Sequence, residues 1–418
     1  MRAGNSVIVL GGGIIGVTSA YFLARQGLRV TLLERRSAVG LETSFANGGL
    51  LTPSMSDPWA APGLPRKLLG WIGKEDAPFL LRLGALPGLM SWGLRFLGNC
   101  NEETWRHNTA TILAIAEYSH AVLDELTHSS GLDYDLSTLG TLKLFRDELS
   151  MASAERAAAV VGDLGVAVRR LDTAGCLDLE PALAAQSGEL AGGLHFPDDR
   201  SGDAYKFTQA LVELCRKERV TFRFNEEVRE IVTDSGSVTG IVTDKERLRA
   251  DAYLLALGSA SPHFKLGFKL PIYPVKGYSV TLSTEGWNAA PRVPLIDDGR
   301  KMGFTRLGDR LRIAGTAEFN GYNLDMNERR GGQLIEGLMG LFPDFPNRHM
   351  AHHWTGLRPM TPDGIPVLGE SPLRNLYLNV GHGHLGWTLA CGSAKAVADL
   401  MVEEKPDVKI DGASLQRF

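Results

Sequence analysis

A glycine-rich turn near the N-terminus limits the fold of this chain more than any other stretch does. Ser6–Leu10 is a short apolar run, Gly11-Gly12-Gly13-Ile14-Ile15-Gly16 follows it, and Val17–Gln26 has the apolar content of a buried helix. A second apolar run, Arg29–Leu33, ends at Glu34. The order strand, turn, helix, strand and acid predicts a Rossmann unit that binds a dinucleotide.

Each glycine of this turn has a specific task in such a unit. Gly11 permits the tight turn, Gly13 lets the backbone approach a pyrophosphate, and Gly16 allows the helix to pack closely on the strand. The N-terminus of the helix offers free N–H groups and a partial positive charge to the phosphates. Glu34 is placed to accept hydrogen bonds from ribose hydroxyls.

Composition narrows the classes of protein that need consideration. The chain has 418 residues, enough for two domains or one large discontinuous domain, and 44% of them are hydrophobic. A net charge of −4 argues against a nucleic-acid partner. The four cysteines form no pair at metal-binding or disulfide spacing, which indicates a reducing compartment and no metal site. No secretory signal and no membrane-spanning stretch are recognised, so we expect a cytoplasmic protein.

The segment that follows Glu34 has neither a helical nor a strand period. It is rich in small and polar residues, which is typical of a surface loop or of a loop that follows the rest of a long cofactor. Arg35 and Arg36 offer an alternative, because they could hold a 2′-phosphate and make the cofactor NADP. The loop residues assigned to the cofactor are Thr43, Ser44, Asn47, Gly48, Gly49 and Leu50.

The middle of the chain alternates helical and strand patterns. Residues 79–97 are amphipathic and interrupted at Pro87, which predicts short helices over a cleft or, alternatively, a contact with a membrane surface. Residues 134–145 resemble strands with Gly140 between them, and residues 270–321 resemble antiparallel strands of a second domain. Helices are predicted at 103–126, 148–164, 203–219 and 327–341, and further strands at 220–224, 228–233, 238–243 and 252–257.

The C-terminal region repeats the opening pattern. A strand at 376–380 runs into Gly381-His-Gly-His-Leu-Gly-Trp-Thr388, and a helix is predicted at 389–403. A nicotinamide cofactor needs no second glycine turn, whereas the isoalloxazine of a flavin extends beyond the first one. The fold class is therefore α/β, a Rossmann-type FAD-binding domain (1–54, 200–260 and 350–418) with an inserted, mostly antiparallel substrate domain (55–199 and 261–349).

With these motifs in place, the sequence resembles the FAD-dependent oxidoreductases of the D-amino-acid oxidase and glycine oxidase type. It is most similar to the bacterial D-amino acid dehydrogenase (small subunit) family. The stretches that carry the resemblance are Val9–Gly16, Thr43–Gly49, Pro58–Pro62, Pro274–Tyr278, Ala314–Glu318, Gly356–Gly364 and Gly381–Thr388. The resemblance implies oxidation at the carbon bearing the amine, with an amino acid as substrate.

The resemblance also implies roles for individual residues. Arg358 matches the arginine that binds the substrate carboxylate, His384 falls beside flavin and substrate, and Tyr278 is a second substrate contact. Each has a structural alternative: an ion pair for Arg358, a turn role for His384 and sheet packing for Tyr278. The residues assigned to FAD, besides the loop above, are Gly11, Gly13, Ile14, Ile15, Gly16, Glu34, Arg35, Arg36, Val228, Gly258, Gly383, His384, Leu385, Gly386, Trp387 and Thr388.

Two further readings stay open at this point. A glycine, sarcosine or proline oxidase or dehydrogenase could use the same scaffold, and so could a flavin-containing subunit that only assists assembly. In the leading hypothesis the electrons pass to a quinone or another carrier, and residues 79–97 could hold the protein at the inner face of the cell membrane. The sequence makes no prediction about the oligomeric state.

Overall fold

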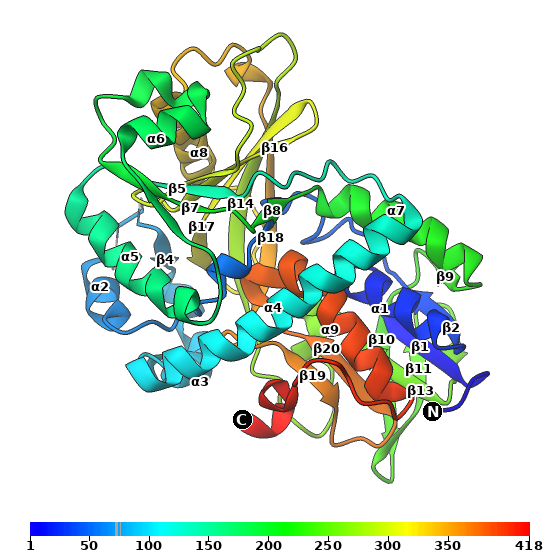
Figure 1. The fold of residues 1–418 in the computed structure, drawn as a ribbon. Coiled ribbons are helices and arrows are strands. Elements are labelled where there is room, and N and C mark those ends of the chain that lie inside the picture. The colour runs from blue at the N-terminus through cyan, green and yellow to red at the C-terminus, as the bar shows by residue number, and fades with distance from the viewer. Residues whose placement is uncertain (72–73, 76) are drawn as a thin grey trace.

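The computed structural model describes residues 1–71, 74–75 and 77–418. Two principal sheets occupy opposite halves of the molecule, and the long helix α4 (Glu102–Ser130) runs diagonally across the view in Figure 1. The chain ends in the same half in which it begins. Its N-terminal ammonium donates a hydrogen bond of 2.7 Å to the carbonyl of Met401.

The N-terminal strand is central in a six-stranded sheet of order β19-β20-β13-β1-β2-β9. Its strands are β1 (Ser6–Leu10), β2 (Arg29–Leu33), β9 (Thr221–Arg223), β13 (Ala252–Leu255), β19 (Val367–Glu370) and β20 (Leu376–Val380). All neighbours are parallel except β19 and β20. Because β1 has β2 on one side and β13 on the other, the glycine turn after Leu10 lies where ligands bind in open α/β sheets.

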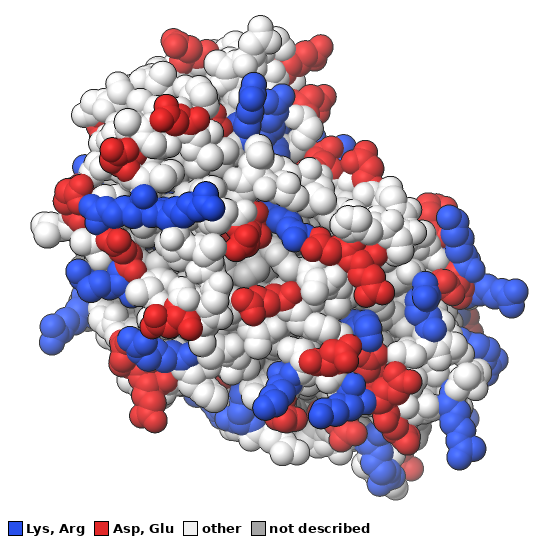
Figure 2. Space-filling view, viewed as in Figure 1, with Lys and Arg blue, Asp and Glu red and all other residues white. Residues whose placement is uncertain are grey.

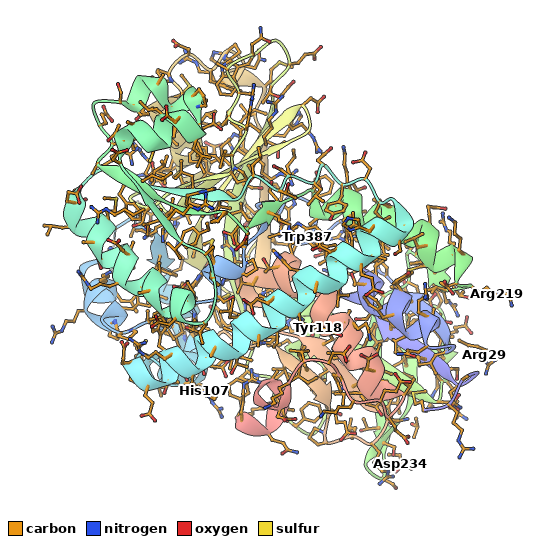
Figure 3. The ribbon with its side chains drawn as sticks, in the orientation of Figure 1. Arg29, His107, Tyr118, Arg219, Asp234 and Trp387 are labelled. Atoms are coloured by element: carbon orange, nitrogen blue, oxygen red, sulfur yellow. The ribbon has the colours of Figure 1, made fainter. Side chains whose placement is uncertain are left out.

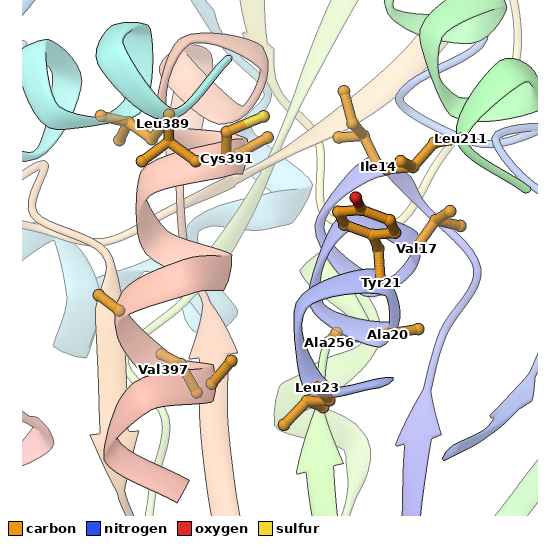
Figure 4. Close-up of a cluster of buried hydrophobic side chains, with 14 of the residues drawn as sticks. Ile14, Val17, Ala20, Tyr21, Leu23, Leu211, Ala256, Leu389, Cys391 and Val397 are labelled. Carbon is orange, nitrogen blue, oxygen red and sulfur yellow. The ribbon is translucent and has the colours of Figure 1, made fainter. Parts of the chain in front are cut away.

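Helices α1 (Ile14–Arg25), α4, α7 (Ala204–Lys217) and α9 (Gly386–Met401) cover this sheet. Figure 4 shows α1 and α9 side by side, with Val17 and Leu23 on one helix and Leu389 and Val397 on the other; all four side chains are buried. Local chemistry sets the helix ends. The carboxylate of Asp203 caps α7, and α4 ends at Gly131, whose φ of +67° favours glycine.

The second sheet has nine strands, in the order β18-β14-β17-β16-β15-β5-β7-β6, with β4 paired to β17. Its strands are β4 (Phe79–Leu81), β5 (Thr141–Phe145), β6 (Arg169–Leu171), β7 (Gly192–Phe196), β14 (Tyr273–Ser283), β15 (Leu295–Asp297), β16 (Met302–Leu307), β17 (Arg310–Phe319) and β18 (His352–Met360). Helix α8 (Glu328–Leu341) packs on one face, against the row of cross-strand neighbours Val280, Ile313, Phe304, Leu295 and Leu142. Since side chains alternate along strands, the residues between these point to the other face.

The remaining elements are short or peripheral. They are a small sheet of β10 (Val228–Asp234), β11 (Ser237–Thr243) and β12 (Arg247–Leu248), the pair β3 (Leu50–Leu51) and β8 (Arg200–Ser201), and the helices α2 (Leu64–Trp71), α3 (Leu86–Gly98), α5 (Glu148–Asp163) and α6 (Thr173–Leu179). None of the helices within the described ranges combines the length and the apolar character needed to cross a bilayer.

Two sequence predictions about elements are wrong. Residues 79–81 form β4 rather than a helix, and Pro87 lies in the first turn of α3, where proline starts a helix instead of interrupting it. Residues 134–140 form no strand apart from a single bridge at Ser137, and β5 begins only at Thr141.

Two elements also lie in a different half from the one predicted. Helix α4, assigned to 55–199, packs against α9 in the core of the six-stranded sheet. Strand β18, assigned to 350–418, pairs along its whole length with β14 in the nine-stranded sheet. Amphipathic period alone could not decide either case, because it does not specify the partner of the apolar face.

Candidate functional site

A continuous cavity of about 980 Å³ runs between the two halves of the molecule. It is bordered by the carboxyl ends of β1, β2, β13 and β20 and by one face of the nine-stranded sheet. Both glycine turns border it: Gly11–Ile15 from the N-terminal turn and Gly383–Trp387 from the C-terminal one. The two ends of the chain therefore meet at one site, as predicted.

The N-terminal turn has the geometry predicted for phosphate binding. Gly11 has a φ of +108°, and a Cβ on it would lie 2.6 Å from the carbonyl oxygen of Ala256. A Cβ on Gly16 would clash with the carbonyl of Gly11, so α1 packs on the strand only with glycine there. Gly13, the N-cap of α1, borders the cavity, where a Cβ on it would meet only Ser44 Oγ, at 3.8 Å, and the first turn holds no acidic residue that would neutralise the helix dipole.

Glu34 follows β2 and is 7% exposed. Its carboxylate accepts hydrogen bonds from the backbone N–H groups of Gly12 (2.8 Å) and Arg36 (2.7 Å). Burial raises the pKa of Glu34, and these two hydrogen bonds lower it in part. Each carboxylate oxygen retains acceptor capacity for a ribose hydroxyl.

The two arginines after Glu34 are both paired with one carboxylate. Arg35 and Arg36 both contact Glu42 Oε1, at 2.8 and 2.7 Å. Burial would raise the pKa of Glu42, but the two guanidinium groups hold it below its usual value. The pairing disfavours the NADP alternative, which needs an arginine for the 2′-phosphate.

The loop at residues 43–50 fastens the two halves together. Ser44 Oγ accepts from the N–H of Ile14 at the start of α1, and Thr43 Oγ1 donates to the carbonyl of Leu357 on β18. The nine-stranded sheet donates to the loop in return: Ser279 Oγ to Ala46 O, Thr305 Oγ1 to Gly48 O and Arg312 Nη1 to Asn47 O. The loop is therefore a fixed wall of the cavity.

The C-terminal turn supplies the opposite wall. Gly383 has a φ of +58°, which favours glycine, and the first turn of α9 holds no acidic residue. Trp387 is 2% exposed and donates from Nε1 to the carbonyl of Gly202 at 3.0 Å. Figure 3 places it at the end of α9 that is nearest to the second half of the molecule.

Most of the residues predicted to bind the cofactor border the cavity, and four do not. Those that do are Gly11, Gly13, Ile14, Ile15, Glu34, Arg35, Thr43, Ser44, Asn47, Gly48, Leu50, Val228, Gly258, Gly383, His384, Leu385, Gly386 and Trp387. Gly16 packs beneath the turn, Arg36 pairs with Glu42, Gly49 faces Leu307 and Thr305, and Thr388 Oγ1 accepts from the N–H of Thr52. These four support the walls without reaching the cavity.

One row of cross-strand neighbours forms the floor of the cavity. Trp354 on β18, Ser279 on β14, Ala314 on β17, Gly303 on β16, Ile296 on β15 and Lys143 on β5 are paired in succession, and all six border the cavity. With strands about 4.8 Å apart, the row spans about 24 Å. Its central members are small, which leaves room above the sheet for a flat ring and a substrate.

Arg358 on β18 extends its guanidinium over this floor. It is half-buried and borders the cavity, and within the described ranges no carboxylate forms an ion pair with it. Its only hydrogen bond among the described residues is from Nη1 to the carbonyl of Thr316, at 3.0 Å. Burial lowers the pKa of Arg358 to about 10, so it stays charged at neutral pH. The alternative of a structural ion pair is therefore wrong for these residues.

Two features of the neighbouring strands make room for this guanidinium. A Cβ on Gly277 would lie 2.5 Å from Arg358 Nη1, so only glycine fits beneath the side chain. Opposite Gly277, the pairing of β14 with β17 shifts by one residue between Lys276 and Tyr278. At this bulge Thr316 has a φ of +57°, an unfavourable conformation for a β-branched residue, and its carbonyl meets Arg358.

Trp59 lies between Arg358 and His384. Its ring stacks on the His384 ring at a centroid distance of 5.2 Å, and Arg358 Cζ lies 5.8 Å from the Trp59 ring. Burial, together with the charge of Arg358, lowers the pKa of His384 to about 4. His384 is therefore neutral at physiological pH and adds no second positive charge to the site.

Tyr278 is not brought to Arg358. It pairs with Thr355, between Gly277 and Ser279, so its side chain points to the face covered by α8. Its hydroxyl donates to the buried carboxylate of Glu318, which also contacts Arg82 Nε (2.8 Å) and Lys276 Nζ (3.4 Å). Burial and the neighbouring carboxylate raise the pKa of Tyr278. Tyr278 borders the cavity, but its hydroxyl is held by Glu318 on the other face of the sheet, so this hydroxyl is not part of the substrate site.

Gly277, Thr316 and Trp59 contribute to the site without having been predicted as site residues from the sequence. A glycine inside a strand marks a close backbone approach, so Gly277 carried a readable signal beside Tyr278. The bulge at Thr316 and the position of Trp59 depend on long-range pairing and left no local signal. The residues present fit a flavin dinucleotide, because both helix N-termini are uncompensated and Gly13 is open to the cavity. Within the described part of the chain, no group of three metal-ligating side chains gathers.

Comparisons with known proteins agree with this geometry. The family DAO, FAD dependent oxidoreductase, matches residues 6–400. A protein of Paramagnetospirillum magneticum named D-amino acid dehydrogenase is 46% identical over 99% of this chain and 98% of its own length.

Solved structures of lower identity share the fold. Glycine oxidase from Geobacillus kaustophilus superposes with a TM-score of 0.76 at 23% identity over 99% of both chains. L-proline dehydrogenase from P. horikoshii superposes with a TM-score of 0.78 at 17% identity, over 100% of this chain and 98% of its own. The chain thus belongs to the DAO family of FAD-dependent oxidoreductases.

Proposed function

We propose that this FAD-dependent oxidoreductase oxidises a D-amino acid to the imine, which water converts to a 2-oxo acid and ammonia. Two kinds of support carry the proposal: relatives named D-amino acid dehydrogenase over nearly the whole chain, and a charged arginine in the cavity with which no carboxylate of the described residues forms an ion pair. The arginine is the single decisive observation. A half-buried guanidinium without a carboxylate keeps hydrogen-bond donors directed at the cavity, where the carboxylate of a ligand can accept from them.

In this proposal Gly11–Ile15 and the start of α1 hold the pyrophosphate, Glu34 the ribose, and Val228 lies near the adenine. The loop at 43–50, Gly258 and residues 383–387 border the flavin. When bound, FAD supplies the hydride acceptor for the hydrogen on the substrate α-carbon. Arg358 binds the substrate carboxylate with the donors that Thr316 leaves free, and so fixes which face of the α-carbon is presented.

The experiment is an anaerobic substrate panel, read from the loss of the flavin absorbance band. We expect D-amino acids to reduce the flavin. Reduction by glycine, N-methylglycine or cyclic imino acids instead of D-alanine would support the alternative oxidase or dehydrogenase. A protein that binds FAD and is reduced by no amine would be the non-catalytic subunit, and this proposal would be wrong.

Arg358→Lys tests the role of the guanidinium directly. Lysine keeps the charge but cannot form the two parallel hydrogen bonds, so substrate should bind at least about tenfold more weakly. The FAD content should not change, which an absorbance spectrum checks. Unchanged affinity for substrate would remove Arg358 from the site.

We further propose that the electrons pass to a quinone or similar carrier at a membrane surface. On α3 the apolar side chains Leu86, Met90, Leu94 and Leu97 follow helical spacing, and Met90 and Leu94 are 65% and 70% exposed. The buried face of α3 belongs to an apolar cluster with Leu64, Trp59 and Phe79, which border the cavity. This cluster links the cavity wall to an exposed apolar helix, as expected for a peripheral membrane protein.

Charge gives no support for a nucleic-acid partner. Figure 2 shows lysines and arginines interspersed with aspartates and glutamates on the face in view, with no continuous basic stripe there. A nucleic-acid site requires a basic face.

A further inference from the structure

The cavity continues beyond Arg358 to a second group of charged side chains. Asp57, Lys143, Asp298 and Lys301 all border it, and they come from the segment before Trp59, from β5 and from the β15–β16 turn. None of them was singled out from the sequence. They lie on the far side of the cavity floor, because Lys143 closes the row that begins with Trp354.

The charges in this group are not equally paired. Lys143 Nζ and Lys301 Nζ both contact Asp298 Oδ1, at 3.0 and 2.8 Å. Asp57 forms no ion pair with any residue of the described ranges, although its side chain is open to the cavity. Asp57 is exposed, and the charges of Lys143 and Lys301 act on its carboxylate without an ion-pair contact, so the lysines are near but do not touch it. Among the described residues, Asp57 is thus the carboxylate of the group without an ion pair, and Lys67, which borders the cavity near Lys301, is an ammonium without one.

The distance from Arg358 to this group suits an extended amino-acid side chain. The guanidinium lies over Gly277 on β14, and Lys301 lies at the start of β16, which is two strands away. Two strand spacings are about 10 Å, close to the extended length of lysine or arginine from carboxylate to terminal nitrogen.

Small residues form part of the cavity floor between Arg358 and this charged group. The line itself crosses β17 at Thr316, and Ala314 and Gly303 are cross-strand neighbours in the next row, two residues along their strands from Thr316 and Lys301; both border the cavity. Their small size leaves a channel above the sheet in which methylene groups can lie. A substrate held at Arg358 by its carboxylate therefore has space for a long side chain in the direction of Asp57.

We propose that Asp57 accepts a hydrogen bond from a cationic group at the end of the substrate side chain, and so gives the enzyme a preference for long basic D-amino acids. The inference rests on the proposed function. Asp57 is a specificity-determining residue in this role, and it takes no part in the oxidation at the α-carbon. Lys143 and Lys301, held by Asp298, limit the preference by repelling the same cation.

The first experiment compares D-lysine with D-norleucine, which has the same carbon chain without the terminal amine. In Asp57→Asn we expect the ratio of kcat/KM for D-lysine over D-norleucine to fall at least tenfold, because a charge-assisted hydrogen bond is lost. An unchanged ratio would overturn the proposal. The flavin absorbance spectrum of the variant serves as the check on folding.

A binding measurement gives a readout that does not depend on turnover. The probes are 6-aminohexanoate and hexanoate, which have a carboxylate for Arg358 and no oxidisable α-amine. Calorimetry on the FAD-loaded protein should find 6-aminohexanoate bound at least tenfold more tightly than hexanoate in the wild type, and nearly equal affinities in Asp57→Asn. Equal affinities in the wild type would contradict the proposal.

Lys143→Met provides a matched variant with an effect of the opposite sign. Removing one positive charge near Asp57 should raise the D-lysine to D-norleucine ratio, and a fall would count against the assignment. Different results would contradict the proposed function and the role of Asp57. If no D-amino acid reduces the flavin, the proposed function is wrong, whereas equal use of D-lysine and D-norleucine by wild type and Asp57→Asn refutes only the role of Asp57.

Discussion

Gly277 has a large effect on the site although it has no side chain. The guanidinium of Arg358 occupies the space in which a Cβ would stand, 2.5 Å from Nη1. The neighbouring bulge, with Thr316 at a φ of +57°, aims a carbonyl at the same guanidinium. The position of the Arg358 guanidinium therefore depends on the lack of a side chain at Gly277 and on the strained backbone at Thr316.

Gly277→Ala tests this at the residue scale. The new methyl group should displace the guanidinium and lower kcat/KM for the preferred substrate at least about tenfold, since misplacement by about 1 Å is costly. Gly332→Ala, on α8 with no atom within 4 Å of its Cβ, is the matched control. It should leave kcat/KM unchanged and stabilise the protein by about 0.5–1 kcal/mol. Equal kinetics for both variants would contradict the role of Gly277.

At the scale of elements, α3 differs from the other helices in the way its apolar residues are divided. Trp92 and Phe96 pack against Tyr273 and Phe319 in the apolar cluster beside the cavity, while Met90 and Leu94 remain exposed. Two apolar faces on one short helix indicate two partners. The inner partner is the protein itself, and the outer one is, in our proposal, a lipid surface.

Met90→Glu combined with Leu94→Glu should reduce binding to vesicles of phosphatidylglycerol and phosphatidylethanolamine at least tenfold, because two charges would face the acyl boundary. Co-sedimentation measures this. Leu149→Glu is the control, since Leu149 is 84% exposed on α5 and belongs to no apolar stripe. Substrate turnover with a soluble dye as acceptor should be equal in all three proteins. Vesicle binding that is unaffected in the double variant would exclude α3 as the contact.

At the scale of the whole molecule, the cavity exists only because two sheets are joined. The loop at 43–50 is hydrogen-bonded to α1 on one side and to β14, β16, β17 and β18 on the other. Folding also buries polar groups that would be hydrated in an unfolded chain, among them His382 at the cavity and His120 on α4. Burial lowers the pKa of His382 to about 3 and that of His120 to about 4.

These buried histidines predict loss of stability in acid. Because each stays neutral in the folded state, the unfolded chain binds protons first as the pH falls below about 6.5. Each histidine should cost about 2 kcal/mol of unfolding free energy between pH 7.5 and pH 5. Urea unfolding at pH 7.5, 6 and 5 should therefore be less pH-dependent in His382→Gln than in the wild type. Equal dependence would show that His382 is protonated in the native state.

Local spacing was sufficient for most of the elements and for both glycine turns. Gly11 and Gly16 act through the conformation and packing of the turn itself, and the strand pattern predicted over residues 270–321 covers the region that holds β14, β16 and β17. The cofactor class followed from the same local signals. Arg358 was also found, although its significance depends on what surrounds it.

Tertiary structure alone decided the faces and the partners. Tyr278 and Gly277 are adjacent in sequence, yet pairing with β18 directs one toward α8 and the other toward Arg358. Helix α4 and strand β18 lie in halves of the molecule that their sequence positions did not predict. The spacing of apolar residues along the chain determines which side chains share a face of a strand or helix. The long-range pairing of strands determines what that face contacts, and the chemistry of the cavity depends on these contacts.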